Sequence, residues 1–290
     1  MRSKIFFIIA ATLLCVSCEK TFVMETELEI VSRSETFTAT IECEPSTRTS
    51  LSDFNSNESF YSLIWSKGDA ISISDGAKTA IYTTDDNYSL TAEFIRSEGS
   101  ISNKASQYTA FYPSTITTSN MVLPATQNYV EDNVENFPMR AVSTSKDLSF
   151  KNLCGIIRFS LKSEEIGQIS ISSISLSADK GMSGTFTVSE DNAAVVSEND
   201  GVILSCGVPQ SLYRSSTTDF NIIVPKGSYN PLKVKITDSD GREINLVSEE
   251  AITVKRSEIT RITLTLAKSA FETSLETIPI TDSDVDFTER

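Results

Sequence analysis

The chain has 290 residues, a formal net charge of −14 and no histidine. Its length fits one large domain or two ordinary ones. Without histidine there is no Ser-His-Asp or Cys-His catalytic site, and no zinc site with a histidine ligand. The acidic balance argues against a nucleic-acid partner, because binding to phosphates needs clustered Lys and Arg.

The composition favours β-structure. The sequence contains 44 Ser and 31 Thr but only 11 Gly and 8 Pro. Hydroxyl-bearing residues interleaved with Ile and Val are typical of strands whose outward faces are polar.

The N-terminus has the features of an export signal. Residues 1–4 include the basic residues Arg2 and Lys4. Ten uncharged residues, 5–14, follow, and they are too few to cross a bilayer. Cys18 follows after a Val-Ser pair, as in the lipobox of bacterial lipoproteins. We therefore expect a signal peptide over residues 1–17 and lipidation of Cys18. An ordinary secretory signal is the alternative, since Cys15 stands where lipoboxes have Leu.

The first alternating segment after the signal covers residues 36–43. Phe37, Ala39, Ile41 and Cys43 alternate with Thr and Glu. A period of two indicates a strand with one buried face.

Further strands follow up to residue 112. Trp65, the single tryptophan, ends an apolar trio; we expect it in the core, and a sugar-stacking platform is the alternative. Asp75-Gly76 predicts a hairpin turn between two alternating segments. Segments 90–95 and 108–112 come next, and residues 126–136 have the composition of a polar linker.

A second run of strands begins at Leu148. A phase slip at Ser172-Ser173 predicts a β-bulge, and Asp240-Gly241 predicts a hairpin. The alternating segments are residues 157–161, 169–176, 185–188, 202–206, 220–224, 233–236, 244–247 and 259–266.

These patterns predict an all-β fold with two consecutive β-sandwich domains. The expected division is a signal peptide (1–17), an N-terminal segment with the first strand (18–48), two sandwich domains (49–144 and 145–268) and an acidic tail (269–290).

No catalytic, metal or cofactor site is expected. Residues 143–146 fit the S-x-x-K pattern of penicillin-recognising enzymes, but no K-T-G follows and the segment is not helical. Residues 238–241 resemble the start of a calcium loop but read as a hairpin turn, and the acidic residues 282–286 read as a solvated tail. A hydrolase with paired carboxylates remains an alternative, although nothing places two of them together.

The cysteines do not form a disulfide framework. If Cys18 carries lipid, Cys43, Cys154 and Cys206 remain, an odd number. All three lie in strand-like sequence, so we expect buried free thiols; a single disulfide between two of them is the alternative.

Six motifs, in this order, resemble the Bacteroidetes-type fimbrillin family of type V pilus subunits. They are Thr47-Arg48-Thr49 after the lipobox, then W-S-K-G-D-A-I from Trp65, Y-T-A-F-Y-P from Tyr108, L-P-A-T-Q from Leu123, L-S-F-K-N-L-C-G-I-I-R-F from Leu148 and F-N-I-I-V-P from Phe220.

The resemblance implies two transthyretin-like or Greek-key sandwich domains and a lipoprotein exported to the outer membrane. It also implies cleavage after an arginine, removal of the first strand and β-strand addition from another fimbrial subunit. Arg48 is the candidate processing site, since a cut there removes residues 36–43; a plain loop arginine is the alternative. Arg33 is the second candidate, but a cut there leaves that strand in place.

The donor strand is expected in the C-terminal part, either within residues 252–266 or in the tail around residues 275–280. Residues 252–266 are the preferred candidate, because the alternation of the tail is poor. The resemblance does not distinguish a stalk, anchor or tip subunit and identifies no receptor. The competing hypothesis is a surface lipoprotein that binds a glycan or a host protein and never polymerises.

Overall fold

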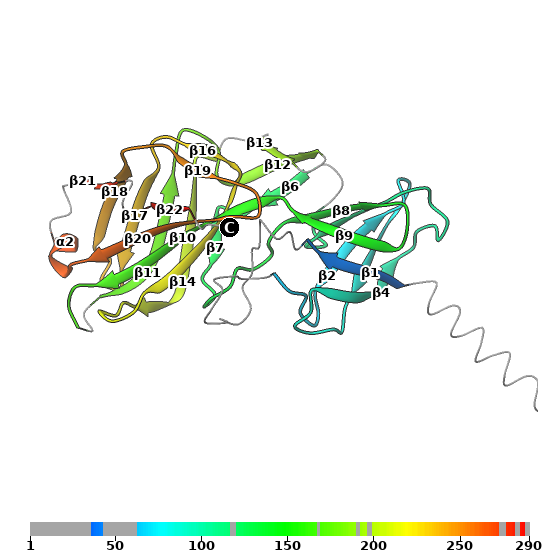
Figure 1. The fold of residues 1–290 in the computed structure, drawn as a ribbon, viewed down its shortest axis with the longest axis horizontal. Coiled ribbons are helices and arrows are strands. Elements are labelled where there is room, and N and C mark those ends of the chain that lie inside the picture. The colour runs from blue at the N-terminus through cyan, green and yellow to red at the C-terminus, as the bar shows by residue number, and fades with distance from the viewer. Residues whose placement is uncertain are drawn as a thin grey trace, which may run out of the picture. The chain divides into compact units, whose positions relative to one another are not determined.

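The computed structural model describes residues 36–42, 63–116, 120–166, 169–189, 192–195, 199–272, 277–281 and 285–287. In these ranges the chain is made of strands, with one five-residue helix, α2 (Lys268–Glu272) (Figure 1). The prediction of an all-β fold is confirmed. Apart from Thr36, every described strand residue belongs to one compact unit, Phe37–Arg290.

Seven strands of the N-terminal half close into a barrel. Their order is β1-β4-β3-β2-β5-β8-β9. The strands are β1 (Thr36–Ile41), β2 (Ala70–Ser74), β3 (Thr79–Thr83), β4 (Thr91–Gly99), β5 (Tyr108–Tyr112), β8 (Met139–Ser143) and β9 (Asp147–Asn152). β1 pairs parallel with β9, so the first strand of the chain closes the barrel against the last strand of this half.

The C-terminal half contains two larger sheets. One has the order β15-β10-β20-β22, and the other has the order β21-β18-β17-β11-β14-β7. Their strands are β7 (Thr126–Asn128), β10 (Cys154–Ser163), β11 (Ser170–Ser177), β14 (Gly201–Ser211), β15 (Thr218–Pro225), β17 (Lys233–Asp238), β18 (Glu243–Ser248), β20 (Ile259–Leu266), β21 (Thr277–Ile280) and β22 (Val285–Phe287).

Two small sheets complete the fold. They are β13-β12-β6 and β16-β19. The strands are β6 (Asn120–Leu123), β12 (Gly184–Ser189), β13 (Asn192–Val195), β16 (Gly227–Tyr229) and β19 (Ile252–Val254).

The local features predicted from the sequence are confirmed. β2 and β3 pair as a hairpin around Asp75-Gly76, and β17 and β18 pair around Asp240-Gly241. Gly241 has a φ of +78°, a conformation that glycine adopts without strain. The register of β11 shifts between Ile171 and Ser173, where the bulge was expected.

The Asp238 carboxylate binds groups of its own turn. It is 2% exposed and accepts hydrogen bonds from the backbone N–H groups of Asp240 and Arg242, both at 2.9 Å. The Arg242 guanidinium pairs with it at 2.7 Å. The interpretation of residues 238–241 as a hairpin turn is therefore confirmed.

Buried side chains form two hydrophobic clusters. One gathers the inward residues of the barrel, and the other gathers inward residues of the four-stranded and six-stranded sheets. The first also includes Phe186, Val188, Ile223 and Ile259, which follow the barrel strands in the sequence. The domain limits at residues 144 and 145 stay a prediction.

The segment interpreted as a polar linker, residues 126–136, contains a strand. Residues 126–128 form β7, which pairs parallel with β14. Gln127 is buried, and its amide donates to the carbonyl of Ile223 at 2.8 Å and accepts from the N–H of Ile223 at 2.9 Å. A polar side chain is stable there because both ends of its amide are paired, which hydrophobic alternation does not reveal.

Replacing Gln127 is expected to destabilise the protein. Gln127→Ala leaves the buried N–H and carbonyl of Ile223 unpaired, which costs about 1–3 kcal/mol per group. Asn128→Ala, at an exposed position of the same strand, is the matched control. Urea unfolding measures both; equal midpoints would contradict the role of this amide.

Candidate functional site

The groove filled by β1 is the candidate functional site. β1 lies between β4 and β9 in the barrel. The structure describes the predicted strand from Thr36 through Glu42, and its ladder ends at Ile41; Cys43 lies outside the described residues. The other barrel strands come later in the chain, and β6 and β7, which belong to other sheets, lie between β5 and β8.

Three side chains of β1 point into the core, as predicted. Phe37, Ala39 and Ile41 are 1%, 0% and 3% exposed. The Phe37 ring meets the rings of Tyr82 and Tyr108 edge-on, with centroids 5.0 and 4.9 Å away. Edge-on contacts between aromatic rings stabilise the fold beyond the burial of their apolar surface.

The backbone of β1 is paired on both sides. Its N–H groups donate to strands or loops flanking the groove: Thr38 to the carbonyl of Lys146 (3.0 Å), Ile41 to Leu90 (3.0 Å) and Glu42 to Phe150 (2.8 Å). Loss of the strand would leave both walls of the groove with unpaired backbone groups.

Trp65 lies in the core, as predicted, and contacts β1 directly. It is 1% exposed, and its indole Nε1–H donates to the carbonyl oxygen of Ala39 at 2.9 Å. Phe94, Tyr112 and Phe150 surround the indole, each edge-on. Burial excludes the alternative of a sugar-stacking platform at this residue.

Lys146, the lysine of the S-x-x-K match, covers the start of β1. Its Nζ lies 5.5 Å from the centroid of the Phe37 ring and 3.4 Å from Oδ1 of Asn103. Ser143 is hydrogen-bonded to Ser145 within the β8–β9 turn. The motif is thus part of a hairpin that borders the groove.

Glu42 forms an anchor at the end of β1 that the sequence did not reveal. Its Oε1 accepts hydrogen bonds from the N–H of Asn152 (2.8 Å), the hydroxyl of Ser257 (2.7 Å) and the guanidinium of Arg256. The Glu42 side chain is 10% exposed. Glu42 and Arg256 are 214 residues apart in the sequence, so no local pattern links them.

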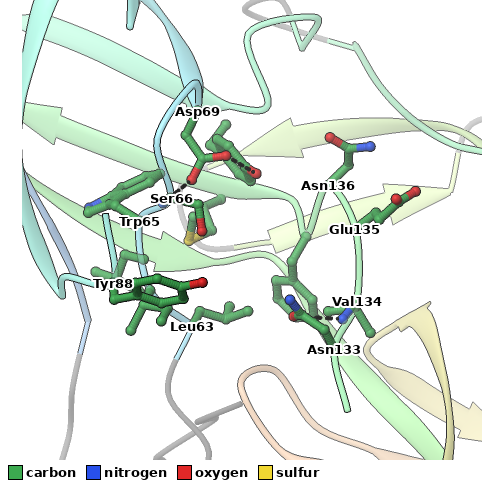
Figure 2. Close-up of a pocket in the computed structure, with 14 residues that line it drawn as sticks. Leu63, Trp65, Ser66, Asp69, Tyr88, Asn133, Val134, Glu135 and Asn136 are labelled. Atoms are coloured by element: carbon green, nitrogen blue, oxygen red, sulfur yellow. Dashed lines mark hydrogen bonds between the residues drawn. The ribbon is translucent and has the colours of Figure 1, made fainter. Parts of the chain in front are cut away.

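A pocket of about 510 Å³ opens beside the end of β1. Figure 2 shows Leu63, Asp69 and Tyr88 on one side of it and Asn133 and Glu135 on the other.

Within the pocket Asp69 is already engaged. Its Oδ1 accepts the hydroxyl of Tyr112 at 3.0 Å, and its Oδ2 accepts the N–H of Ser66 at 2.8 Å. Burial, together with the neighbouring Asp69 carboxylate, raises the pKa of the Tyr112 hydroxyl above its usual range. The phenol therefore stays a donor at physiological pH.

Cys154 and Cys206 are buried free thiols, as expected. Burial raises the pKa of Cys206 to about 11 and raises that of Cys154 further. Thiols held in the protonated form are poor nucleophiles, so neither is suited to catalysis.

Cys18, Arg33 and Arg48 lie outside the described residues, so lipidation and processing stay predictions. In the tail, residues 277–280, part of the second donor candidate, form β21, and residues 285–287, which overlap the segment expected to be solvated, form β22. Strand pairing with β18 and β20 keeps these parts of the tail on the two sheets.

The described ranges contain no helix that is long and apolar enough to cross a membrane. Within the same ranges, no three acidic, Cys or His side chains gather in a group that could hold a metal ion.

Phe37→Ala is expected to lower stability by about 3–5 kcal/mol, because it removes a buried ring between two tyrosines. Thr38→Ala, at the neighbouring outward position, is the control and should change little. Trp65 emission followed through urea unfolding gives both midpoints. Similar midpoints for the two variants would show that β1 contributes no core packing.

The fold has known counterparts among solved structures. A candidate cell adhesion protein from Bacteroides ovatus aligns over 88% of this chain and 95% of its own, with 11% identity and a TM-score of 0.56. Another from Bacteroides uniformis aligns over 81% and 93%, with 16% identity and a TM-score of 0.50. The tip fimbrial protein Mfa3 from Porphyromonas gingivalis aligns over 79% and 95%, with 8% identity and a TM-score of 0.33.

No protein-family model and no curated protein sequence matches the chain. At such low identities the likeness of the first two structures establishes the fold. The chain therefore has the all-β fold of these Bacteroides proteins.

Proposed function

We propose that the chain is a subunit of a cell-surface fimbrium of the fimbrillin type, which supports adhesion and assembles by strand exchange. The observation that carries this proposal is β1, a short strand that completes the barrel but is joined to β2 only through residues 42–69. The ordered fimbrillin motifs and the fold shared with candidate adhesion proteins support it.

Cleavage after Arg48 would separate β1 from the rest of the barrel without breaking any other strand connection. Loss of β1 would expose the core positions that Phe37, Ala39 and Ile41 fill. This is unfavourable, because burying a large apolar side chain is worth about 1.5–3 kcal/mol. Unpaired backbone groups along β4 and β9 add to this cost. A strand from another subunit would restore both, so cleavage makes assembly favourable without an external energy source.

Lipidation at Cys18 would hold the subunit at the outer membrane until it is processed. One acyl chain alone gives only marginal anchoring, and stable anchoring takes more than one. We propose a structural role without catalysis, with other fimbrial subunits and membrane lipid as partners. Mass analysis of the N-terminal peptide would detect the acyl chains on Cys18 before processing.

Arg48→Ala is expected to accumulate monomers that keep the first strand, because the groove stays filled. Export and lipidation should be unchanged. Mildly denaturing gels of surface protein, together with N-terminal sequencing, measure this; the unmodified chain should begin at Thr49 and form polymer ladders.

Arg33→Ala is the matched control, since a cut at Arg33 leaves β1 in place; it should polymerise normally. Ladders from Arg48→Ala like those of the unmodified chain, with no cut at Arg33, would rule out the strand-exchange mechanism.

The pocket beside β1 supports a second candidate function, binding of a glycan by a subunit that does not polymerise. Tyr88 borders the pocket, is 79% exposed and has a φ of +56°. Non-glycine residues in this strained conformation are enriched at functional sites. The exposed ring of Tyr88 offers a stacking face, and Asn133 and Glu135, on the other side of the pocket, offer polar groups for sugar hydroxyls.

Tyr88→Ala is expected to reduce glycan affinity by about five- to 150-fold if the ring stacks on a sugar, because one aromatic stacking contact with a nucleic-acid base is worth about 1–3 kcal/mol. Tyr213→Ala, at another exposed tyrosine away from the pocket lining, is the control. Binding to a panel of immobilised glycans is the measurement. Absence of binding by the unmodified chain would exclude this function.

A further inference from the structure

The hydrogen-bond donors that surround Glu42 are held in place without it. Residues 255–258 form a turn against the start of β10: the N–H of Ser257 donates to the carbonyl of Cys154 at 2.9 Å, and the N–H of Ile156 donates to Glu258 at 3.0 Å. A Cβ on Gly155 would lie 2.3 Å from the carbonyl oxygen of Lys255, so the turn and the strand are in close contact. The donors therefore stay when β1 leaves.

Any strand that replaces β1 must satisfy these donors. Asn152 and Ser257 are 2% and 1% exposed, and the Arg256 side chain is 25% exposed. Buried donors without a partner are costly, and a partly buried guanidinium needs a carboxylate more than it needs a neutral acceptor. An incoming strand should therefore carry an acidic residue at the position of Glu42.

One segment after β20 meets this requirement. In β1, Glu42 comes one residue after Ile41 and five residues after Phe37. The acidic residue of a replacement strand must therefore have apolar residues one and five positions before it. The acidic residues after β20 are Glu272, Glu276, Asp282, Asp284, Asp286 and Glu289. Of these, only Glu276 has large apolar residues at both positions, so residues 271–276 (F-E-T-S-L-E) repeat the pattern of residues 37–42 (F-T-A-T-I-E).

The sheet topology argues against residues 252–266 as the donor. β20 pairs with β10 on one side and with β22 on the other, so withdrawing it would break the four-stranded sheet. Phe271 lies in α2, a helix of five residues, which is too short to be stable by itself. Phe271 is 2% exposed, so it would exchange one buried environment for another.

We propose that residues 271–276 of a second copy of this chain fill the groove in the register of residues 37–42, and that Glu276 is the residue that selects this register. The inference rests on the strand exchange proposed above. Phe271 takes the place between Tyr82 and Tyr108, and the backbone carbonyl of Thr273 accepts the indole of Trp65. Thr273 is larger than Ala39, so the core adjusts at that one position.

The test uses the full chain, cut after folding. Residues 46–50 are replaced by a site-specific protease sequence, and the fragment that carries β1 stays bound after the cut. Four fluorescent peptides with blocked ends then compete for the groove. They are residues 34–42, residues 268–276, and two variants of the second peptide, Glu276→Ala and Glu272→Ala. Glu272 takes the outward position of Thr38, so its replacement is the matched control for the same chemical change.

The peptide of residues 268–276 is expected to displace the first strand. Glu276→Ala should weaken its binding by about ten- to a hundredfold, the usual effect of losing hydrogen bonds to a charged group. Glu272→Ala should weaken it less than about threefold, as is usual for an exposed charge. Arg256→Gln in the cut chain should shrink the difference between the parent peptide and Glu276→Ala.

Each contrary result has its own meaning. If the peptide of residues 34–42 enters the groove and that of residues 268–276 does not, the assigned donor segment is wrong and strand exchange stands. If both enter and Glu276→Ala binds like its parent, the acidic requirement is wrong. If neither peptide enters, strand exchange itself fails, and this inference fails with it.

Discussion

The hydrogen bond from the indole of Trp65 to the carbonyl of Ala39 joins the barrel core to the strand that closes it. A buried carbonyl requires such a partner, and here the donor is a tryptophan that is itself 1% exposed. The rings of Phe94, Tyr112 and Phe150 contact the indole edge-on. The core is therefore built around a strand that is separated from β2 by residues 42–69.

A second group of contacts reaches from the same strand to the C-terminal half. Glu42 gathers donors from the end of β9 and from the turn after β19 onto a single carboxylate oxygen. Gln127 makes a comparable connection to Ile223 in β15. In both cases a polar side chain is buried because its partners are fixed backbone or neighbouring polar groups, and the position becomes specific for that side chain.

Local periodicity explains what the sequence could predict. Alternation places Phe37, Ala39 and Ile41 on one face whatever the strand pairs with, and the bulge at Ser173 appears directly as a slip in that alternation. The Asp-Gly turns are equally recognisable, because glycine is needed for their backbone conformation. These features depend on neighbours in the chain only.

The partners of β1 depend on contacts far apart in the sequence. Nothing local shows that β1 runs parallel to β9 or that Glu42 meets Arg256. In the sequence Lys146 only completes a match to a catalytic motif, because its position relative to Phe37 exists only in the folded chain. Burial of Trp65 was predictable from its apolar neighbours, whereas its role as a hydrogen-bond donor to β1 was not.

The place of β1 in the barrel matters for the symmetry of any assembly in which another copy supplies this strand. If the proposed donor segment of one copy entered the barrel of the next, the two contacting surfaces would differ. Such a contact is heterologous and does not form an isologous two-fold dimer. If the rotation between neighbouring copies does not close a ring, the contact repeats without limit. A filament built in this way would have two chemically distinct ends, one with an open groove and the other with an unused donor segment, and this polarity would follow from the asymmetry of a single chain.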